Sequence, residues 1–403
     1  MILGRDAWEP RFHFCDEVSN IMDDETPPMV PLGEWLLNPD MVFLNHGSYG
    51  AVPRVVFNEQ RRLQERMERD PSEFLVLELP DALRAAANDL ARFIQGVGSD
   101  LAFVENATAG CNTVLASMQF APGDEILVTD HGYPAVRKAA EYYAARAGAS
   151  VVVVAVPFPT SDPRQIVNAV ATRLGRRSRL AILDHVTSPT AVVFPVRELT
   201  SICHDAGAQV LIDGAHAPGM LSLDVPAIGA DWYVGNCHKW LMAPKGSGFL
   251  WTSPARHAET HPLVISHGFS QGLEAEFDWV GTRDPTAWLS VPAAIDFHHR
   301  SGGHLLRERN MRLARQASNL LISRWNSERG AIDALTGSMS TVRLPMNGEV
   351  TDDRALAIRR ALRKEHRIDA AIIAFNGAFW LRLSAQAYNE MENYERLAEA
   401  FSN

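Results

Sequence analysis

A lysine and an aspartate that each follow a short apolar run are the residues of this chain whose types suit one shared chemistry. Lys239 lies in Gly235-Asn236-Cys237-His238-Lys239, and Asp213 ends the run Val210-Leu211-Ile212-Asp213. A lysine amine can form a Schiff base with an aldehyde, and an aspartate can pair with a protonated pyridine nitrogen. The pair therefore predicts a site for pyridoxal 5′-phosphate (PLP).

Residues that could bind the phosphate group lie near similar strand ends. The segment 103–113 ends an apolar run and opens a helix with small residues, and a helix start offers free N–H groups to an anion. Ala107 would allow close approach of the backbone, and Thr108 would add a hydroxyl, although Thr108 could equally serve as a helix cap. Asn236 and His238 occupy alternate positions, so both could face the same anion.

These residues need a scaffold in which several strand ends meet, and the chain predicts one. Ser188 closes a further apolar run, where its hydroxyl could reach the phenolic oxygen of the cofactor or simply complete a turn. Apolar runs alternate with stretches of helical spacing, which indicates a mainly parallel sheet with covering helices. Right-handed crossovers would bring the loops after the strands to one edge, where ligands bind. The predicted strands are 101–104, 125–129, 150–156, 180–184, 209–213, 232–235 and 248–251.

The pattern changes along the chain in a way that predicts three parts. Residues 1–42 are rich in proline and acidic residues and are predicted to form an arm outside the main fold. Residues 43–291 would form the large α/β domain. Residues 292–403 would form a smaller α+β domain that begins with one long helix over about 294–328 and continues with short strands near 337–344 and 378–384.

Composition excludes several classes of function. The chain has 403 residues, of which 46% are hydrophobic and 21% charged, as in ordinary globular proteins. A net charge of −10 argues against nucleic-acid binding, which needs a basic surface. The longest apolar stretch, 151–156, is far too short to cross a membrane. The four cysteines show no paired spacing, so we expect neither a disulfide framework nor a zinc site, and a cytoplasmic location.

Taken in order, the motifs of this chain resemble the class V aminotransferase-like branch of fold-type I PLP enzymes, and most closely the isopenicillin N epimerase-like group. The set spans nearly the whole chain beyond residue 42. Each motif is weak alone, but their order is specific. The motifs are Phe43-Leu44-Asn45-His46-Gly47-Ser48-Tyr49-Gly50, Asn106-Ala107-Thr108, Thr129-Asp130-His131-Gly132-Tyr133, Asp213-Gly214-Ala215-His216, Cys237-His238-Lys239-Trp240 and Trp279-Val280-Gly281-Thr282-Arg283-Asp284.

The resemblance implies a role for each matching residue. Lys239 would carry the cofactor, Asp213 would contact the pyridinium nitrogen, and His216 with Ser188 would contact the phenolic oxygen. Tyr133 would cover the ring or face the substrate. The phosphate would be held by Ala107, Thr108, Asn236 and His238, and by Gly281 and Thr282 of a neighbouring subunit, which implies a homodimer with shared sites.

The resemblance also implies a site for the amino acid substrate. Arg382, in Trp380-Leu381-Arg382-Leu383-Ser384, matches the family's arginine for the α-carboxylate, because a guanidinium can bind a carboxylate through two parallel hydrogen bonds. A structural ion pair is the alternative for an arginine within an apolar strand. Asn45 and His46 are also expected to contact the substrate.

Three other readings of the sequence are set aside. His257 and His261 have metal-ligand spacing, but the glutamate between them is misplaced for H-E-x-x-H and no third ligand follows, so no metal is expected. Pro244-Lys245-Gly246-Ser247-Gly248 lacks the order of a phosphate loop. Cysteine desulfurases need a nucleophilic cysteine in the second half of the chain, and none lies beyond Cys237.

The reaction itself stays open between several outcomes of Cα deprotonation. With a sulfur leaving group on Cβ, C–S β-elimination would give pyruvate and ammonia, and this is the reaction that the resemblance favours. Epimerisation would need a second acid on the opposite face, for which Tyr133 is the candidate. Decarboxylation with oxidative deamination is a further alternative. A non-catalytic binding module is disfavoured, because Lys239 and Asp213 are both present.

Overall fold

The large domain of this computed structural model, which describes residues 30–401, is built on a seven-stranded sheet. The strand order is β2-β8-β7-β6-β5-β3-β4, in which β8 runs antiparallel to both neighbours and the other neighbouring pairs are parallel. The strands are β2 (Leu101–Val104), β3 (Glu125–Thr129), β4 (Ser150–Val154), β5 (Ser178–Asp184), β6 (Gln209–Gly214), β7 (Trp232–Asn236) and β8 (Gly248–Thr252).

These strands coincide with the seven predicted runs, and the expected mainly parallel α/β fold is confirmed. The runs are apolar throughout because both faces of the sheet are covered. Leu211 packs in one cluster with Val114 of the helix α4 (Ala107–Ser117), whereas Ile212 packs in another with Leu199 of α7 (Val196–Asp205) on the opposite face. Successive side chains of one strand therefore belong to two separate cores.

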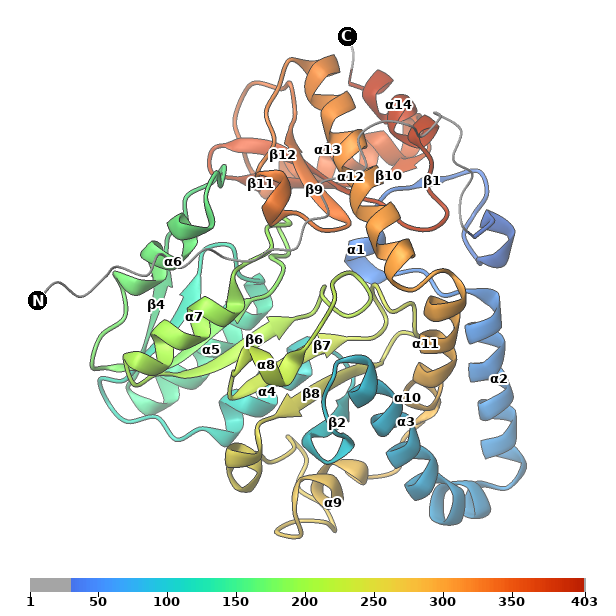
Figure 1. The fold of residues 1–403 in the computed structure, drawn as a ribbon, viewed down its shortest axis with the longest axis vertical. Helices are drawn as coiled ribbons and strands as arrows, with labels where there is room; N and C mark the ends of the chain where they lie inside the picture. The colour runs from blue at the N-terminus through green and yellow to red at the C-terminus, as the bar shows by residue number, and fades with distance from the viewer. Residues whose placement is uncertain (1–29, 402–403) are drawn as a thin grey trace, which may run out of the picture.

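Helices surround the sheet (Figure 1). A π-helical segment, η2 (Glu73–Glu78), links two long helices at one side of the molecule, and short 3₁₀ segments are η1 (Leu32–Glu34), η3 (Gly98–Asp100) and η4 (Pro254–Glu259). The helices of this part of the chain are α1 (His46–Tyr49), α2 (Arg54–Arg69), α3 (Leu79–Phe93), α4 (Ala107–Ser117), α5 (Pro134–Ala147), α6 (Pro163–Ala171), α7 (Val196–Asp205), α8 (Val225–Ile228), α9 (Leu273–Asp278), α10 (Thr286–Leu289) and α11 (Val291–Arg300).

The C-terminal part forms a smaller α+β unit with its own apolar core. Its three-stranded antiparallel sheet has the order β11-β12-β9, and a separate two-stranded parallel pair joins β1 to β10. The elements are β1 (Val42–Phe43), α12 (His304–Trp325), η5 (Asp333–Leu335), β9 (Met339–Arg343), α13 (Asp352–Glu365), β10 (Ile368–Asp369), β11 (Ala371–Phe375), β12 (Ala378–Ser384) and α14 (Met391–Glu399).

Two expectations about this region are corrected. The single helix predicted over 294–328 is two helices, α11 and α12, because Gly302 and Gly303 adopt positive φ angles of 111° and 56° that interrupt the helix. Residues 1–29 lie outside the described residues, but Val30, Trp35 and Val42 of the predicted arm are buried against the fold. The indole of Trp35 is 1% exposed, and Val42 pairs with Ile368 of the small domain.

The topology positions the site. The strands β5, β6 and β7 are parallel neighbours whose carboxyl ends open toward the small domain, which lies across that edge of the sheet (Figure 1). The loops that follow these strands carry the predicted site residues. In the part of the chain that the structure describes, no helix is both long and apolar enough to cross a membrane.

Candidate active site

A cavity of about 700 Å³ lies between the sheet edge and the small domain, and we call it the central cavity. Ten of the predicted site residues line it, although they come from segments far apart in the sequence. They are Ala107, Thr108, Tyr133, Ser188, Asp213, His216, Asn236, His238, Lys239 and Arg382. The structure therefore brings most of the predicted site together in one place.

Lys239 follows β7 and places its amine beside a neutral histidine. Its Nζ lies 3.1 Å from Nε2 of His216. Burial of the amine and the positive charge of Arg382 lower the pKa of Lys239 to about 8, so roughly a tenth of the amine is uncharged at pH 7, far more than for an exposed lysine. Burial also holds the pKa of His216 well below its usual range. An uncharged amine is the form that attacks an aldehyde or accepts a proton.

Two carboxyl groups lie next to each other at the floor of the central cavity. Asp213 of β6 and Asp184 of β5 are direct register partners on parallel strands, and both line the cavity. Burial raises the pKa of both groups, and the pKa of Asp184 is raised further by the charge of Asp213. The Oδ1 atom of Asp213 accepts the Ala215 N–H at 3.0 Å, which favours its charged form. We assign the negative charge of the pair to Asp213 and the proton to Asp184.

Ala107 and Thr108 begin α4 at the phosphate end of the predicted site, and both line the central cavity. The Ala107 N–H is donated to Oδ1 of Asn236 at 2.8 Å, so it is not a free donor for an anion. This bond ties α4 to β7. Thr108 lines the cavity in the first turn of α4, where its hydroxyl and the helix dipole favour an anion.

His238 completes this end of the central cavity in a neutral form. Its Nδ1 lies 3.1 Å from the Ser247 carbonyl, which can only accept a hydrogen bond. Burial lowers the pKa of His238 to about 4, so the proton sits on Nδ1 and Nε2 has none to donate. A bound phosphate dianion would raise that pKa and allow Nε2 to donate.

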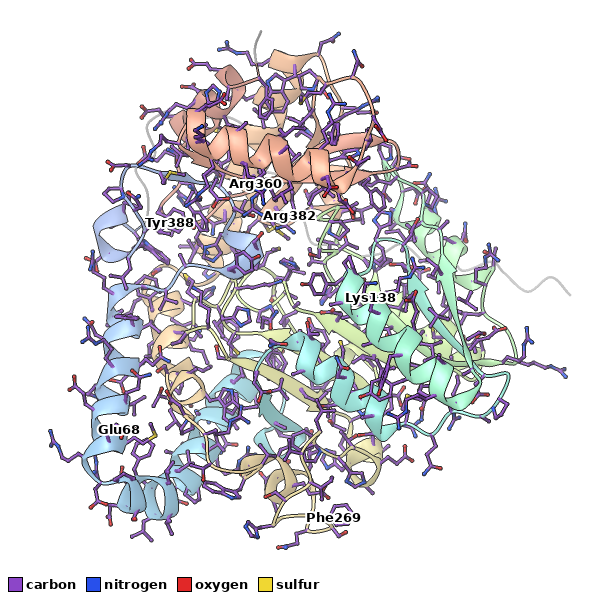
Figure 2. The ribbon with its side chains drawn as sticks, turned by 180° about the vertical axis from the view of Figure 1, so that it is seen from behind. Glu68, Lys138, Phe269, Arg360, Arg382 and Tyr388 are labelled. Carbon is purple, nitrogen blue, oxygen red and sulfur yellow. The ribbon has the colours of Figure 1, made fainter. Side chains whose placement is uncertain are left out.

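Arg382 of β12 reaches the central cavity from the small domain (Figure 2). It donates to the Ser188 carbonyl and, at 2.9 Å, to the Ser48 hydroxyl, while its Nε has no partner among residues 30–401. The structural ion pair considered from the sequence is not what holds it, since its acceptors are neutral oxygens. A buried guanidinium with neutral acceptors is suited to bind a carboxylate ligand.

Asn45 and His46 do not line the central cavity, which corrects the expectation that they contact the substrate. The His46 ring is fully buried, with Nδ1 2.9 Å from the Tyr388 hydroxyl and Nε2 3.0 Å from the Lys239 carbonyl. His46 therefore positions the backbone that carries the lysine. Gly50 packs on the same loop, because a Cβ there would lie 2.0 Å from the His238 carbonyl.

Other predicted residues lie away from the central cavity. Gly281 and Thr282 do not line the cavity of their own chain, and Thr282 is exposed. His257 and His261, the two histidines with metal-ligand spacing, each contact a different acidic side chain. His257 Nε2 lies 3.3 Å from Asp100, and His261 Nδ1 lies 2.7 Å from Glu276.

The residues of the central cavity fit PLP. One oxygen of Asp213 accepts a backbone N–H, and the other has no hydrogen-bond partner among residues 30–401, as the contact to a pyridinium nitrogen requires. The Nδ1 atom of His216 is buried without a partner in the same residues, and such a donor is costly unless a ligand satisfies it. The amine of Lys239 lies beside the opposite nitrogen of that ring.

Sequence reasoning missed three charged residues of the central cavity, which are Glu105, Asp184 and Arg359. Asp184 was noted only as a strand end, although its alignment with Asp213 in the sheet could have suggested a pair. Arg359 of α13 also lines the cavity. It stands in an arginine-rich helix and carries no local signal that distinguishes it from its neighbours.

Comparisons with known proteins agree with this geometry. The sequence family described as Aminotransferase class-V matches residues 67–397. Putative L-cysteine desulfhydrase 1 of Oryza sativa subsp. japonica is 35% identical, over 89% of this chain and 82% of its own. Isopenicillin N epimerase of Streptomyces clavuligerus is 35% identical, over 91% of this chain and 96% of its own. The solved complex of the cystine C-S lyase C-DES with cysteine persulfide has a TM-score of 0.76 at 22% identity, over 91% of this chain and 98% of that chain, and supports the fold.

Proposed function

The chain belongs to the aminotransferase class V family, and from that premise we propose that it is a PLP-dependent C–S β-lyase acting on an S-conjugated cysteine or its sulfoxide. One observation carries the proposal. The low-pKa amine of Lys239, the carboxylate of Asp213 and the guanidinium of Arg382 line one cavity. These are the groups needed to hold an amino acid by its carboxylate and to remove its Cα proton.

Arg382 and Lys239 have different roles in the proposed reaction. Arg382 binds the α-carboxylate and so fixes Cα, and Lys239 accepts the Cα proton on its amine. The bound cofactor, held by Lys239 before substrate arrives and paired with Asp213, supplies an electron sink for the electron pair left on Cα. The C–S bond then breaks and its electrons leave with sulfur, as the thiolate from an S-conjugated cysteine or as the sulfenate from its sulfoxide, and the released enamine hydrolyses to pyruvate and ammonia.

The lining of the central cavity favours elimination over the epimerase alternative. Epimerisation needs a second acid opposite Lys239, and the residues that line the cavity include no second lysine and no cysteine. Tyr133 is the candidate for that role, and its side chain is 44% exposed at the cavity. A tyrosine could equally protonate the departing thiolate. Elimination needs only one base at Cα, and Lys239 can supply it.

The products of one reaction in heavy water test the proposal. The holoenzyme is incubated with S-alkyl-L-cysteines and their sulfoxides, and pyruvate, the chirality of recovered substrate and deuterium at Cα are measured together. We expect pyruvate in equal amount to the thiol released from an S-alkylcysteine, or to the sulfenic acid released from a sulfoxide, without inversion. Inversion without pyruvate would mean epimerisation, and loss of carbon dioxide would mean the decarboxylative alternative.

A homodimer with shared sites is part of the same proposal. Gly281 and Thr282, predicted to bind phosphate, lie outside the cavity of their own chain. They could therefore bind the phosphate in the cavity of a neighbouring copy. Exposed apolar side chains precede them, at Leu263 (50% exposed), Val264 (56%) and Ile265 (56%). Large exposed apolar groups of this kind mark association surfaces.

We also propose a cytoplasmic location. The free thiols of Cys111, Cys203 and Cys237 are consistent with the reducing conditions there.

Subunit mixing tests the shared site. Lys239→Ala and Thr282→Asp should each be inactive alone, the second because it sets a negative charge against the phosphate. After unfolding and refolding together, a heterodimer would hold one intact site, so we expect about a quarter of the wild-type activity to return. Mixing that restores no activity, with dimers present by light scattering, would show that the sites are not shared.

A further inference from the structure

Arg359 of α13 is a second guanidinium at the central cavity. It lines the cavity together with Ile372 and Ile373 of β11, and its side chain is 31% exposed. Its neighbour in the chain, Arg360, and the buried Arg382 are labelled in Figure 2, where α13 crosses the small domain above the cavity. Two arginines therefore line the small-domain wall of the cavity. The α-carboxylate of a substrate requires only one of them.

The protein itself leaves the charge of Arg359 only partly compensated. Its carboxylate partner, Asp369, lies 3.2 Å from Nη2 of Arg359 and 2.5 Å from Nη1 of Arg363. Asp369 also accepts a hydrogen bond from Asn45 at 3.2 Å. One carboxylate thus serves two guanidinium groups. The Nη2 bond to Asp369 uses one of the five N–H donors of Arg359.

The other acids of the central cavity do not supply the missing charge. Glu105 pairs with Arg283 at 2.5 Å. Asp184 and Asp213 lie at the floor, where both interact with Lys239. The positive charge of Arg359 also contributes to lowering the pKa of Arg382 to about 10, after the larger effect of burial. The small-domain wall therefore presents two guanidinium groups whose positive charge the acids of the cavity do not neutralise.

We infer that Arg359 binds a second carboxylate at the distal end of the substrate side chain, so that the preferred substrate is an S-(carboxyalkyl)cysteine. This inference rests on the proposed function and adds the substrate class. Arg382 takes the α-carboxylate, and the apolar side chains of Ile372 and Ile373 line the wall beside the thioether carbons. Arg359 then offers the distal carboxylate its unused donors, which suit two parallel hydrogen bonds.

A matched pair of substrates and a matched pair of variants test the inference. S-(2-carboxyethyl)-L-cysteine is compared with its amide, S-(2-carbamoylethyl)-L-cysteine, which has the same shape without the charge. In Arg359→Gln we expect the preference for the acid, as a ratio of kcat/KM values, to fall about 10- to 100-fold, because the charged partner of the distal carboxylate is lost. The loss should appear in KM for the acid and not in kcat, because the contact is the same in the transition state.

Arg363→Gln is the control, because Arg363 shares Asp369 with Arg359 but does not line the central cavity. It should leave the acid-to-amide ratio unchanged. Equal losses for acid and amide in Arg359→Gln would overturn the inference, since Arg359 would then serve the α-carboxylate or the fold. The ratio of dissociation constants of the two ligands for each holoenzyme, measured by calorimetry, decides the matter even if no pyruvate forms, and in that case the proposed reaction fails separately.

Discussion

Replacing Lys239 by alanine should slow the exchange of the substrate Cα proton for deuterium by about 10²- to 10⁴-fold, the usual contribution of a positioned general base. The reason is that Lys239 is the lysine that lines the central cavity, and its pKa of about 8 leaves it able to accept a proton near neutral pH. Nuclear magnetic resonance of a non-eliminating substrate such as L-alanine in heavy water measures the exchange without requiring C–S cleavage.

Lys138→Ala is the matched control for this variant. Lys138 lies on the exposed side of α5 (Figure 2) and lines no part of the central cavity. We expect wild-type exchange from it, and unchanged circular dichroism from both variants. Exchange at the wild-type rate in a folded Lys239→Ala protein would contradict the assignment of the base.

Asp213→Asn should weaken binding of the cofactor by roughly 10²- to 10⁴-fold, because removing one partner of a buried ion pair costs about 3–5 kcal/mol. The substitution keeps the shape of the side chain and removes its charge from a position that is 5% exposed. Equilibrium dialysis of the cofactor measures the loss directly. A second consequence is a lower proton affinity of the ring nitrogen, which the absorbance of the bound cofactor as a function of pH reports.

Asp184→Asn is the control that shows whether the effect of Asp213→Asn comes from the charge of Asp213 itself. Asp184 is the register partner of Asp213 and its pKa is raised well above the usual range, so an uncharged asparagine resembles its protonated form. We expect cofactor binding to change far less than in Asp213→Asn. An equal loss from the two substitutions would contradict the placement of the negative charge on Asp213.

The elements that position the site could be predicted because their signals are local. Each strand is a short apolar run with a polar residue at its end, and β-strand ends in a parallel sheet meet at one edge. Lys239 and Asp213 follow from that rule together with their chemistry. The order of the motifs predicted the family, and the match to the family confirms that prediction.

The parts that could not be predicted depend on partners distant in the sequence. His46 has a residue type suited to substrate contact, but Tyr388 and the Lys239 carbonyl occupy both its nitrogens. Ala107 has a suitable N–H, but the side chain of Asn236 accepts it. From the sequence, Arg359 resembles any solvent-exposed charge on a helix, but in the fold it lines the cavity beside residues of β11. In each case contacts with residues distant in the sequence, and not the residue type, decide the role.

The position of the cofactor on the chain tests the central claim most directly, and the sequence makes the test clear because it contains only the lysines Lys138, Lys239, Lys245 and Lys364. Borohydride reduction of the holoenzyme fixes the cofactor to its lysine, and mass spectrometry of the peptides then locates the pyridoxyl group. The account predicts the added mass on the peptide that contains Lys239 and on no other. A pyridoxyl group on Lys245, Lys138 or Lys364 with Lys239 unmodified would contradict it.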